Sequence, residues 1–126
     1  TIFRVSKGTT TVTMIDRPGI PGSTFGCNAN MDNVLMSDEA ATPIENPPGC
    51  NTTSTVLAGT FSPNNPLSAF DGLDINGAWS LFASDSVGSD VGTIDQWCLS
   101  YSSPDTMPFL DGFETGDTTR WSAVQP

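Results

Sequence analysis

The sequence of 126 residues contains no histidine. Without imidazole side chains the chain cannot form a histidine-based catalytic triad, a histidine-ligated zinc site or a histidine proton shuttle. No apolar run is long enough to span a bilayer as a helix, and we expect no signal peptide in the first residues given. Because the first residues look like a strand, we expect a mature or cut product. Helical periodicity is absent, so helix should be scarce.

Basic residues are also few, with four Lys and Arg against fourteen Asp and Glu and a net charge of −10. The phosphates of nucleic acid and the surface of an anionic membrane would repel such a chain, which argues against both as partners. Acidity suits a secreted protein or one that binds cations. Solubility alone would explain it equally well.

The three cysteines indicate an oxidising compartment for a chain of this size. Cys27 and Cys50 bracket most of Gly26–Thr53, a stretch rich in Asn, Asp, Pro and Gly that we expect to be loop. A disulfide between them would stabilise the fold by about 3 kcal/mol in the chain-entropy model. The alternative is two free, buried thiols. Cys98 has no evident partner, and is either free and buried or joined to another chain segment.

Short alternating stretches predict an all-β protein. Ile2–Val5 and Thr11–Asp16 form a predicted hairpin with Gly8 in the turn and with Val12 and Met14 facing inward. Three further strands are expected at Thr52–Phe61, Trp79–Ser84 and Thr93–Tyr101.

The last two of these strands form a second predicted hairpin around the acidic loop Ser86–Gly92. Asp74–Gly77 supplies the turn before the first strand, because Asn-Gly accepts positive φ. One face of each strand is apolar, and we expect Trp79 of the first strand and Trp97 of the second to lie in the core. A bulge is expected near Asp95–Gln96, because Ile94 is out of phase with Trp97. The two apolar faces comprise Trp79, Leu81 and Ala83 on the first strand and Trp97, Leu99 and Tyr101 on the second.

Phe70–Tyr101, FDGLDINGAWSLFASDSVGSDVGTIDQWCLSY, resembles the closing half of a P domain, the Homo B module that follows the catalytic domain of subtilisin-like proprotein convertases. The resemblance is carried by an Asn76-Gly77-x-Trp79 turn, an x-Leu81-x-x-x-Asp85 strand and an Asp90-x-Gly92-x-Ile94-x-x-Trp97 return. Upstream, TVTMIDRPG, DEAA and SPNNP fit the bacterial branch in the same order, so the resemblance covers Ile2–Tyr101. It implies a galactose-binding-like jelly-roll β-sandwich that is not catalytic, is often secreted and often binds calcium.

The resemblance also indicates where calcium would bind. Ca²⁺ takes six to eight oxygen ligands, which acidic loops supply. The alternative is that these carboxylates cap turns and accept hydrogen bonds from nearby N–H groups. A glycosidase pair such as Asp38/Glu39 or Asp71/Asp74 is the weaker interpretation, because no cleft-bearing scaffold accompanies it. The metal-ligand candidates are Asp38, Glu39, Asp71, Asp85 and Asp90.

Two surface features complete the candidate sites. Asn51 opens an Asn-Thr-Thr sequon and is a possible glycosylation site. Arg17 is either a ligand-binding cation or, as we expect, the partner of a neighbouring aspartate.

The composition changes after Tyr101, which divides the chain into a β-sandwich over 1–101 and a linker with a C-terminal tail over 102–126. The DGFETGDTTRWS piece of the tail resembles a C-terminal motif of many bacterial secreted proteins. A disordered tail would not keep large apolar groups exposed, so we expect it to dock on its own or a neighbouring domain. Its large apolar residues are Phe109, Leu110, Phe113 and Trp121.

These patterns together predict a non-catalytic structural or interaction module, secreted or on the surface of a bacterial cell. A jelly roll needs about eight strands and only about five are predicted, which would leave a sheet edge unpaired. Insertion of the tail into the next copy by strand addition would build a homo-oligomer or a filament. The alternative is an accessory P domain that stabilises the catalytic domain of a secreted subtilisin-like protease.

Overall fold

The computed structural model describes residues 1–20, 26–27, 29–47, 56–86, 88 and 91–102. The chain divides into two units, Thr1–Val91 and Gly92–Pro126. The described residues of the first unit form five strands and one short 3₁₀-helix, whereas no described residue of the second lies in a helix or strand. The prediction of an all-β protein with little helix is therefore confirmed. No helix within the described ranges is long and apolar enough to cross a membrane.

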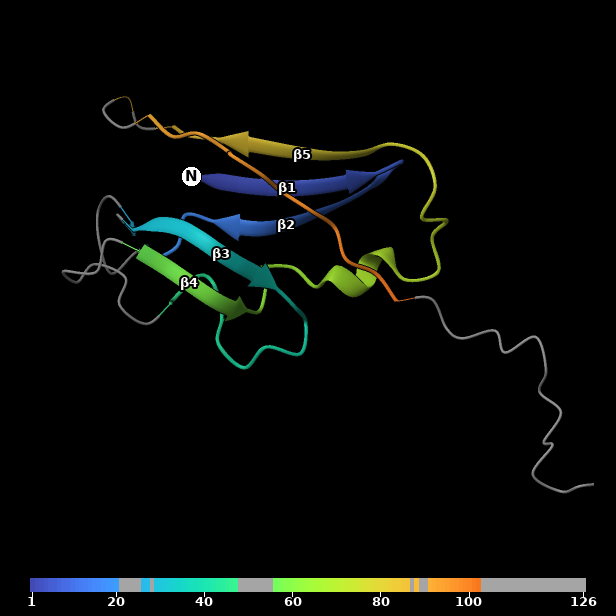
Figure 1. Cartoon of the computed structure of the whole chain (residues 1–126), viewed down its shortest axis with the longest axis horizontal. Helices are drawn as coiled ribbons and strands as arrows, with labels where there is room; N and C mark the ends of the chain where they lie inside the picture. Colours follow the sequence, from blue (N-terminus) through green and yellow to red (C-terminus); the bar gives the residue numbers. More distant parts are fainter. Residues whose placement is uncertain (21–25, 28, 48–55, 87, 89–90, 103–126) are drawn as a thin grey trace, which may run out of the picture. The chain divides into compact units, whose positions relative to one another are not determined.

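The first sheet has the strand order β2-β1-β5, with both neighbouring pairs antiparallel (Figure 1). β1 (Ile2–Lys7) and β2 (Thr10–Asp16) form the predicted hairpin. Its turn is the pair Gly8-Thr9, since Lys7 is opposite Thr10 and Gly8 has a φ of +57°. Glycine is the residue that accepts this φ without strain, which fixes the position of the turn.

A bulge in β2 changes which of its side chains reach the core. Phe3 is opposite Ile15 but Arg4 is opposite Thr13, so Met14 has no direct partner across the strands. Such an extra residue reverses the inward and outward alternation. Val12 is buried as predicted, and Ile15, which strict alternation would place outside, is buried as well. Met14 is half-buried and packs against the core.

The second sheet is a parallel pair of β3 (Asn30–Met36) and β4 (Val56–Phe61). β3 lies in the stretch that we predicted to be loop, and that prediction is wrong. The sequence of β3 shows no regular alternation of apolar and polar residues, because the register shifts between Met31 and Val34. Asn33, which lies within this shift, has a φ of +53°. β4 falls within its predicted range, of which residues 52–55 lie outside the described part.

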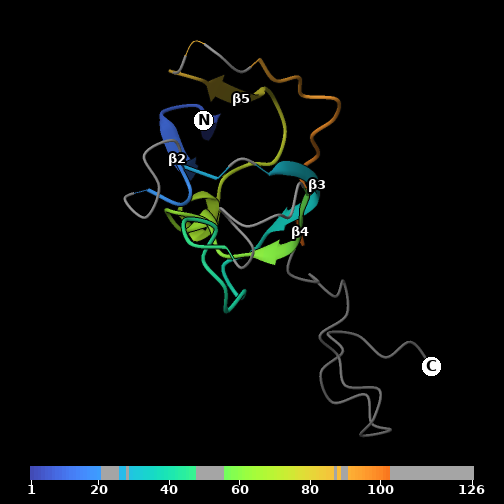
Figure 2. The same cartoon turned by 90° about the vertical axis from the view of Figure 1, so that its left-hand side faces the viewer.

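The core lies between the two sheets, which face each other in Figure 2. Ile15 comes from β2, and Leu57 and Phe61 come from β4. Ile44 belongs to a loop, yet its side chain is 0% exposed. The partly buried residues that pack against this cluster are Phe3, Met14, Ala29, Val34 and Met36.

The predicted hairpin between Trp79–Ser84 and Thr93–Tyr101 is wrong. β5 (Trp79–Ser84) pairs with β1 instead, with Ile2 opposite Ser84. Thr93–Tyr101 has no strand conformation, so the expected bulge within it is also wrong. Trp97 is 42% exposed, which contradicts its prediction as a core residue, whereas Trp79 is half-buried.

Candidate functional site

Asp38, a predicted calcium ligand, lies beside the first turn of the short helix η1 (Leu67–Phe70), whose N-cap residue is Pro66. Its two carboxylate oxygens accept hydrogen bonds from the backbone N–H groups of Leu67 at 2.7 Å and Ser68 at 2.8 Å. Desolvation raises the pKa of Asp38, but the hydrogen bonds from Leu67 and Ser68 outweigh it and hold this pKa below its ordinary value of 3.8. This is the capping role that we set against the calcium role.

Three further predicted metal ligands, Glu39, Asp71 and Asp85, make different contacts in the described part of the chain. The Glu39 carboxylate accepts a hydrogen bond from the Ser37 hydroxyl, which lowers the pKa of Glu39. Asp71 follows η1, and its backbone N–H donates to the carbonyl of Ser68. Asp85 accepts a hydrogen bond from the hydroxyl of Thr1 at 3.4 Å.

No three Asp, Glu or Cys side chains gather into a metal site among the residues that the structure describes. Asp90, the last of the predicted ligands, lies outside those residues. Calcium binding therefore stays a prediction.

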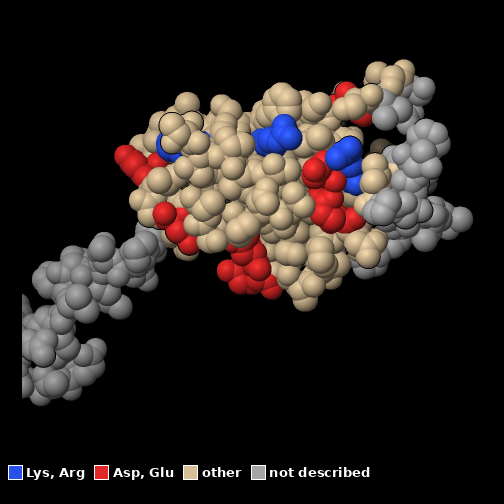
Figure 3. Space-filling model, turned by 180° about the vertical axis from the view of Figure 1, so that it is seen from behind, with Lys and Arg blue, Asp and Glu red and all other residues tan. Residues whose placement is uncertain are grey.

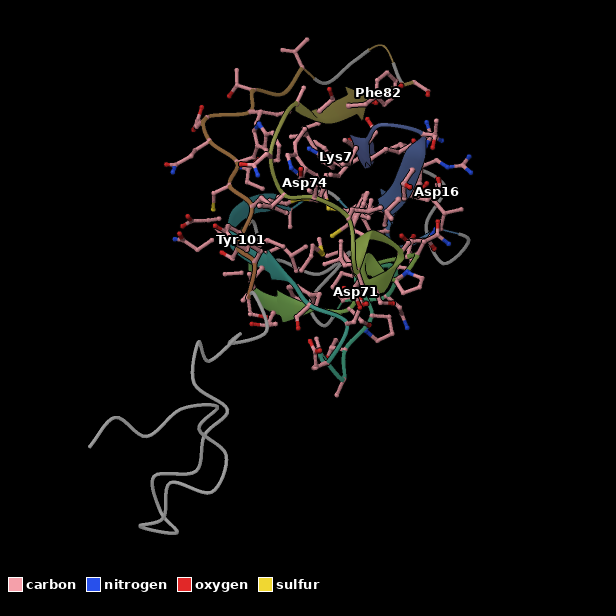
Figure 4. The ribbon with its side chains drawn as sticks, turned by 90° about the vertical axis from the view of Figure 1, so that its right-hand side faces the viewer. Lys7, Asp16, Asp71, Asp74, Phe82 and Tyr101 are labelled. Atoms are coloured by element: carbon pink, nitrogen blue, oxygen red, sulfur yellow. The ribbon has the colours of Figure 1, made fainter. Side chains whose placement is uncertain are left out.

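Asp71 and Asp74, the suggested glycosidase pair, serve different parts of the surface (Figure 4). Asp74 accepts hydrogen bonds from the backbone and the side chain of Asn76, both at 2.9 Å. These two hydrogen bonds lower the pKa of Asp74, and the charge of Lys7 adds to their effect. Asp74 therefore shapes the turn before β5, as Asx residues commonly do.

Arg17 forms an ion pair with Asp16, with 2.9 Å between Nε and Oδ1, as predicted. It borders a pocket of about 110 Å³. That volume is well below the roughly 300 Å³ at which small-molecule sites begin. The pocket walls include Pro18, Cys27, Leu57, Asp85 and Ser86.

Cys27 is half-buried and Cys98 is exposed, and neither forms a disulfide with another described residue. Cys50 and Asn51 lie outside the described residues, so the Cys27–Cys50 disulfide and the glycosylation site stay predictions. The tail residues Phe109, Leu110, Phe113 and Trp121 also lie outside.

The outer edge of β2 is covered by loops. The backbone N–H groups of Asn64 and Asn65 donate to the carbonyls of Met14 and Thr13 at 2.8 and 2.9 Å. At the end of the strand, the Glu45 carboxylate accepts the N–H of Asp16 at 2.7 Å. These contacts occupy backbone groups that would otherwise be open to another strand.

Within the described part of the chain, no strand or loop pairs with the outer edge of β5. β5 pairs with β1 along all six residues without a register shift, and no other described strand pairs with it. Because backbone groups alternate in direction along an antiparallel strand, every second residue points its N–H and C=O away from β1. The strand WSLFAS contains no charged residue and no proline. It therefore lacks the usual features that protect an edge strand from further pairing.

Aromatic contacts hold β5 in place at one end. The indole N–H of Trp79 donates to the carbonyl of Ile75 at 3.0 Å, and the Phe70 ring packs edge-on at 5.0 Å between centroids. The Lys7 ammonium lies 5.3 Å from the centre of the Trp79 ring and donates to the carbonyl of Asn76. These contacts fix the start of β5 beside β1, and none of them occupies its outer edge.

The middle of β5 presents an exposed aromatic residue. Phe82 is 52% exposed, and the Arg4 guanidinium lies 5.8 Å from the centre of its ring. Arg4 also donates to the hydroxyl of Thr13 at 3.3 Å, which links the three strands on this face. Elsewhere, in the view of Figure 3, acidic side chains form several separate groups and no continuous patch.

Comparison of the chain with protein families, with curated proteins and with solved structures gave no significant match. The sequence did not indicate which strand would have an open edge, although the absence of charge and proline in Trp79–Ser84 could have singled out β5.

Proposed function

We propose that this chain is a non-catalytic extracellular structural module that assembles with further copies of itself by strand addition at β5. The observation that carries the proposal is the open, uncharged and bulge-free edge of β5. An added strand satisfies the outward backbone groups of such an edge, and main-chain hydrogen bonds supply its affinity. An edge that accepts a different segment of the next copy makes a heterologous contact, which yields a ring or a filament.

Charge also supports assembly at this edge. The chain has a net charge of −10, so most pairs of surfaces on two copies repel each other. β5 carries no charge, and the nearest basic groups, Arg4 and Lys7, lie over its two aromatic rings. Two acidic copies can therefore approach along β5 with less repulsion than elsewhere.

A second candidate function is the accessory P domain of a secreted subtilisin-like protease. It is favoured by the two facing β-sheets and by the motif residues Asn76-Gly77-x-Trp79, which form the turn into β5. Gly77 has a φ of +96°, a value that favours glycine at this place in the motif. In this alternative an apolar face of the module stabilises the catalytic domain.

The proposal is tested by placing a lysine on each edge of the first sheet. Ser80 on β5 and Thr11 on β2 are both exposed, and both are opposite Ser6 of the central strand. Ser80→Lys should raise the concentration needed for assembly by about tenfold, which corresponds to about 1.4 kcal/mol. Thr11→Lys makes the same change of charge on the covered edge and should leave assembly unchanged.

Light scattering over a concentration series, with electron microscopy of the assemblies, measures the effect. Circular dichroism shows whether both variants are folded, and Phe82→Lys replaces Ser80→Lys if the latter is not. A monomer at every concentration, or equal behaviour of the two edge variants, contradicts the proposed function.

A further inference from the structure

Thr93–Tyr101 is a strand-like sequence without a strand partner. Its side chains alternate from Trp97 to Leu99 to Tyr101, which is the period of a strand. These residues are 42%, 39% and 67% exposed, and Ile94 is 49% exposed. So many large apolar groups exposed in one short segment are typical of a surface that pairs with something else.

The segment and the β5 edge complement each other. Thr93–Tyr101 is long enough to pair along all six residues of β5. Its only charged residue is Asp95, and β5 has none, so their pairing brings no like charges together. Both sequences are rich in aromatic and aliphatic residues, which form favourable cross-strand pairs.

Pairing would also bury the apolar residues on a consistent face. In a strand, Trp97, Leu99 and Tyr101 share one face and Cys98 lies on the other. On β5, Trp79 and Leu81 are half-buried whereas Ser80 and Phe82 are exposed. A strand added with its aromatic face on the Trp79 side continues the half-buried face of the sheet. Cys98 then lies on the same side as Ser80 and Phe82.

We infer that the strand added to β5 is the Thr93–Tyr101 segment of a second copy of this chain, an inference that rests on the proposed function. The chain leaves its own segment without a strand partner and its own β5 edge open, so each copy offers one donor and one acceptor. Reciprocal exchange between two copies closes a dimer. Donation in one direction builds a chain of copies.

Disulfide trapping tests the inference, because Cys98 lies within the proposed donor. Ser80→Cys, Phe82→Cys and Ser84→Cys place a thiol at successive positions on one face of β5, and Thr11→Cys places one on the covered edge as a control. Unlabelled and ¹⁵N-labelled chains are mixed before oxidation, and linked peptides are identified by mass spectrometry. We expect at least one β5 variant to link to Cys98 with mixed isotopes, at a yield at least tenfold above the control.

The other outcomes separate failure of the inference from failure of the proposed function. Links with unmixed isotopes mean that the segment pairs within its own chain, which overturns the inference. Assemblies without any link from Cys98 to β5 also overturn it, but leave assembly by strand addition standing. A monomer at every concentration overturns both.

Removal of Met107–Pro126 distinguishes this donor from the C-terminal tail that the sequence suggested. The truncated chain retains Thr93–Tyr101 and β5. We expect it to assemble to the same extent and to give the same Cys98 link. Loss of both on truncation would identify the tail as the donor and overturn the inference.

Discussion

β2 and β5 form the two edges of one sheet, on either side of β1, yet only one of them is covered. Along β2, Asn64, Asn65 and Glu45 occupy outward backbone groups of the strand. Along β5, no described residue does so. The two edges have similar strand length and the same central partner, so the difference comes from the loops that pass beside them.

The comparison shows that edge protection is a property of distant chain segments. The residues that cover β2 are placed by packing and by capping: Glu45 follows the buried Ile44, and Asn64 and Asn65 precede η1. The backbone of Ile44 is itself held by the Ser62 carbonyl at 2.9 Å. Substitutions that disturb the packing of Ile44 or the start of η1 should expose the outer backbone groups of β2, so that both edges of the sheet could accept another strand.

The largest effect is expected for Ile44→Ala. Its side chain is fully buried against Ile15, Leu57 and Phe61, and its truncation leaves a cavity in this cluster. The free energy of unfolding should fall by about 3 kcal/mol. Thermal and urea unfolding measure the loss.

Val91→Ala is the control, because Val91 is fully exposed and its truncation should change stability by less than about 0.5 kcal/mol. Equal losses in the two variants would contradict the assignment of Ile44 to the core.

Asp38→Ala should have a smaller effect. It removes both hydrogen bonds that cap η1 and should cost about 1 kcal/mol. Because the pKa of Asp38 is lowered in the fold, this stabilisation is present above the ordinary value of 3.8 and is lost as pH falls through the folded pKa. The difference between wild type and variant should therefore shrink at pH 3 in urea unfolding.

Asp71→Ala is the matched control, since no hydrogen bond to its carboxylate is found among the described residues. It should be nearly neutral at both pH values. A pH-independent difference for Asp38→Ala would contradict the capping role.

Glu45→Gln should have the smallest effect, and of opposite sign. Partial burial raises the pKa of Glu45. The hydrogen bond from the Asp16 N–H lowers this pKa and the negative charge of Asp16 raises it, and the net shift is upward. The folded state then binds the proton more tightly, so stability falls as pH rises from the ordinary value of 4.5 through the folded pKa. Gln keeps an oxygen for the N–H of Asp16 without the charge.

After allowance for solvent screening, Glu45→Gln should stabilise the fold at pH 7 by roughly a few tenths of a kcal/mol. The gain should vanish below pH 4, which melting curves at the two pH values would show. Glu39→Gln is the control. Because the pKa of Glu39 is lowered, removal of its charge should not stabilise the fold at either pH. A destabilised Glu45→Gln protein would show that the charge itself holds the β2 cover.

Local signals in the sequence predicted part of the fold. The β1–β2 hairpin follows from alternation around Gly8, and β5 follows from the same period, whereas β4 follows from the Thr and Val content of its range. β3 was missed because Asn33 and the register shift interrupt its alternation. Thr93–Tyr101 has the alternation of a strand, but alternation alone does not indicate whether a partner strand is available.

The candidate site was less predictable because its contacts join distant residues. Whether a carboxylate binds a metal or caps a turn depends on its neighbours in space. Asp38 accepts hydrogen bonds from residues 29 and 30 positions away, which no local pattern indicates. Likewise, nothing in the sequence of β2 shows that Asn64 and Asn65 would lie along its edge.

The parallel pairing of β3 and β4 has a consequence for chain topology. A tight turn can join only antiparallel strands, whereas a parallel pair requires a crossover of roughly a dozen residues or more. The connection from Met36 to Val56 is such a crossover, and both Ile44 and Glu45 belong to it. The route that returns the chain to the start of β4 therefore also supplies a central core residue and the cap of β2. A hairpin in this place would provide neither.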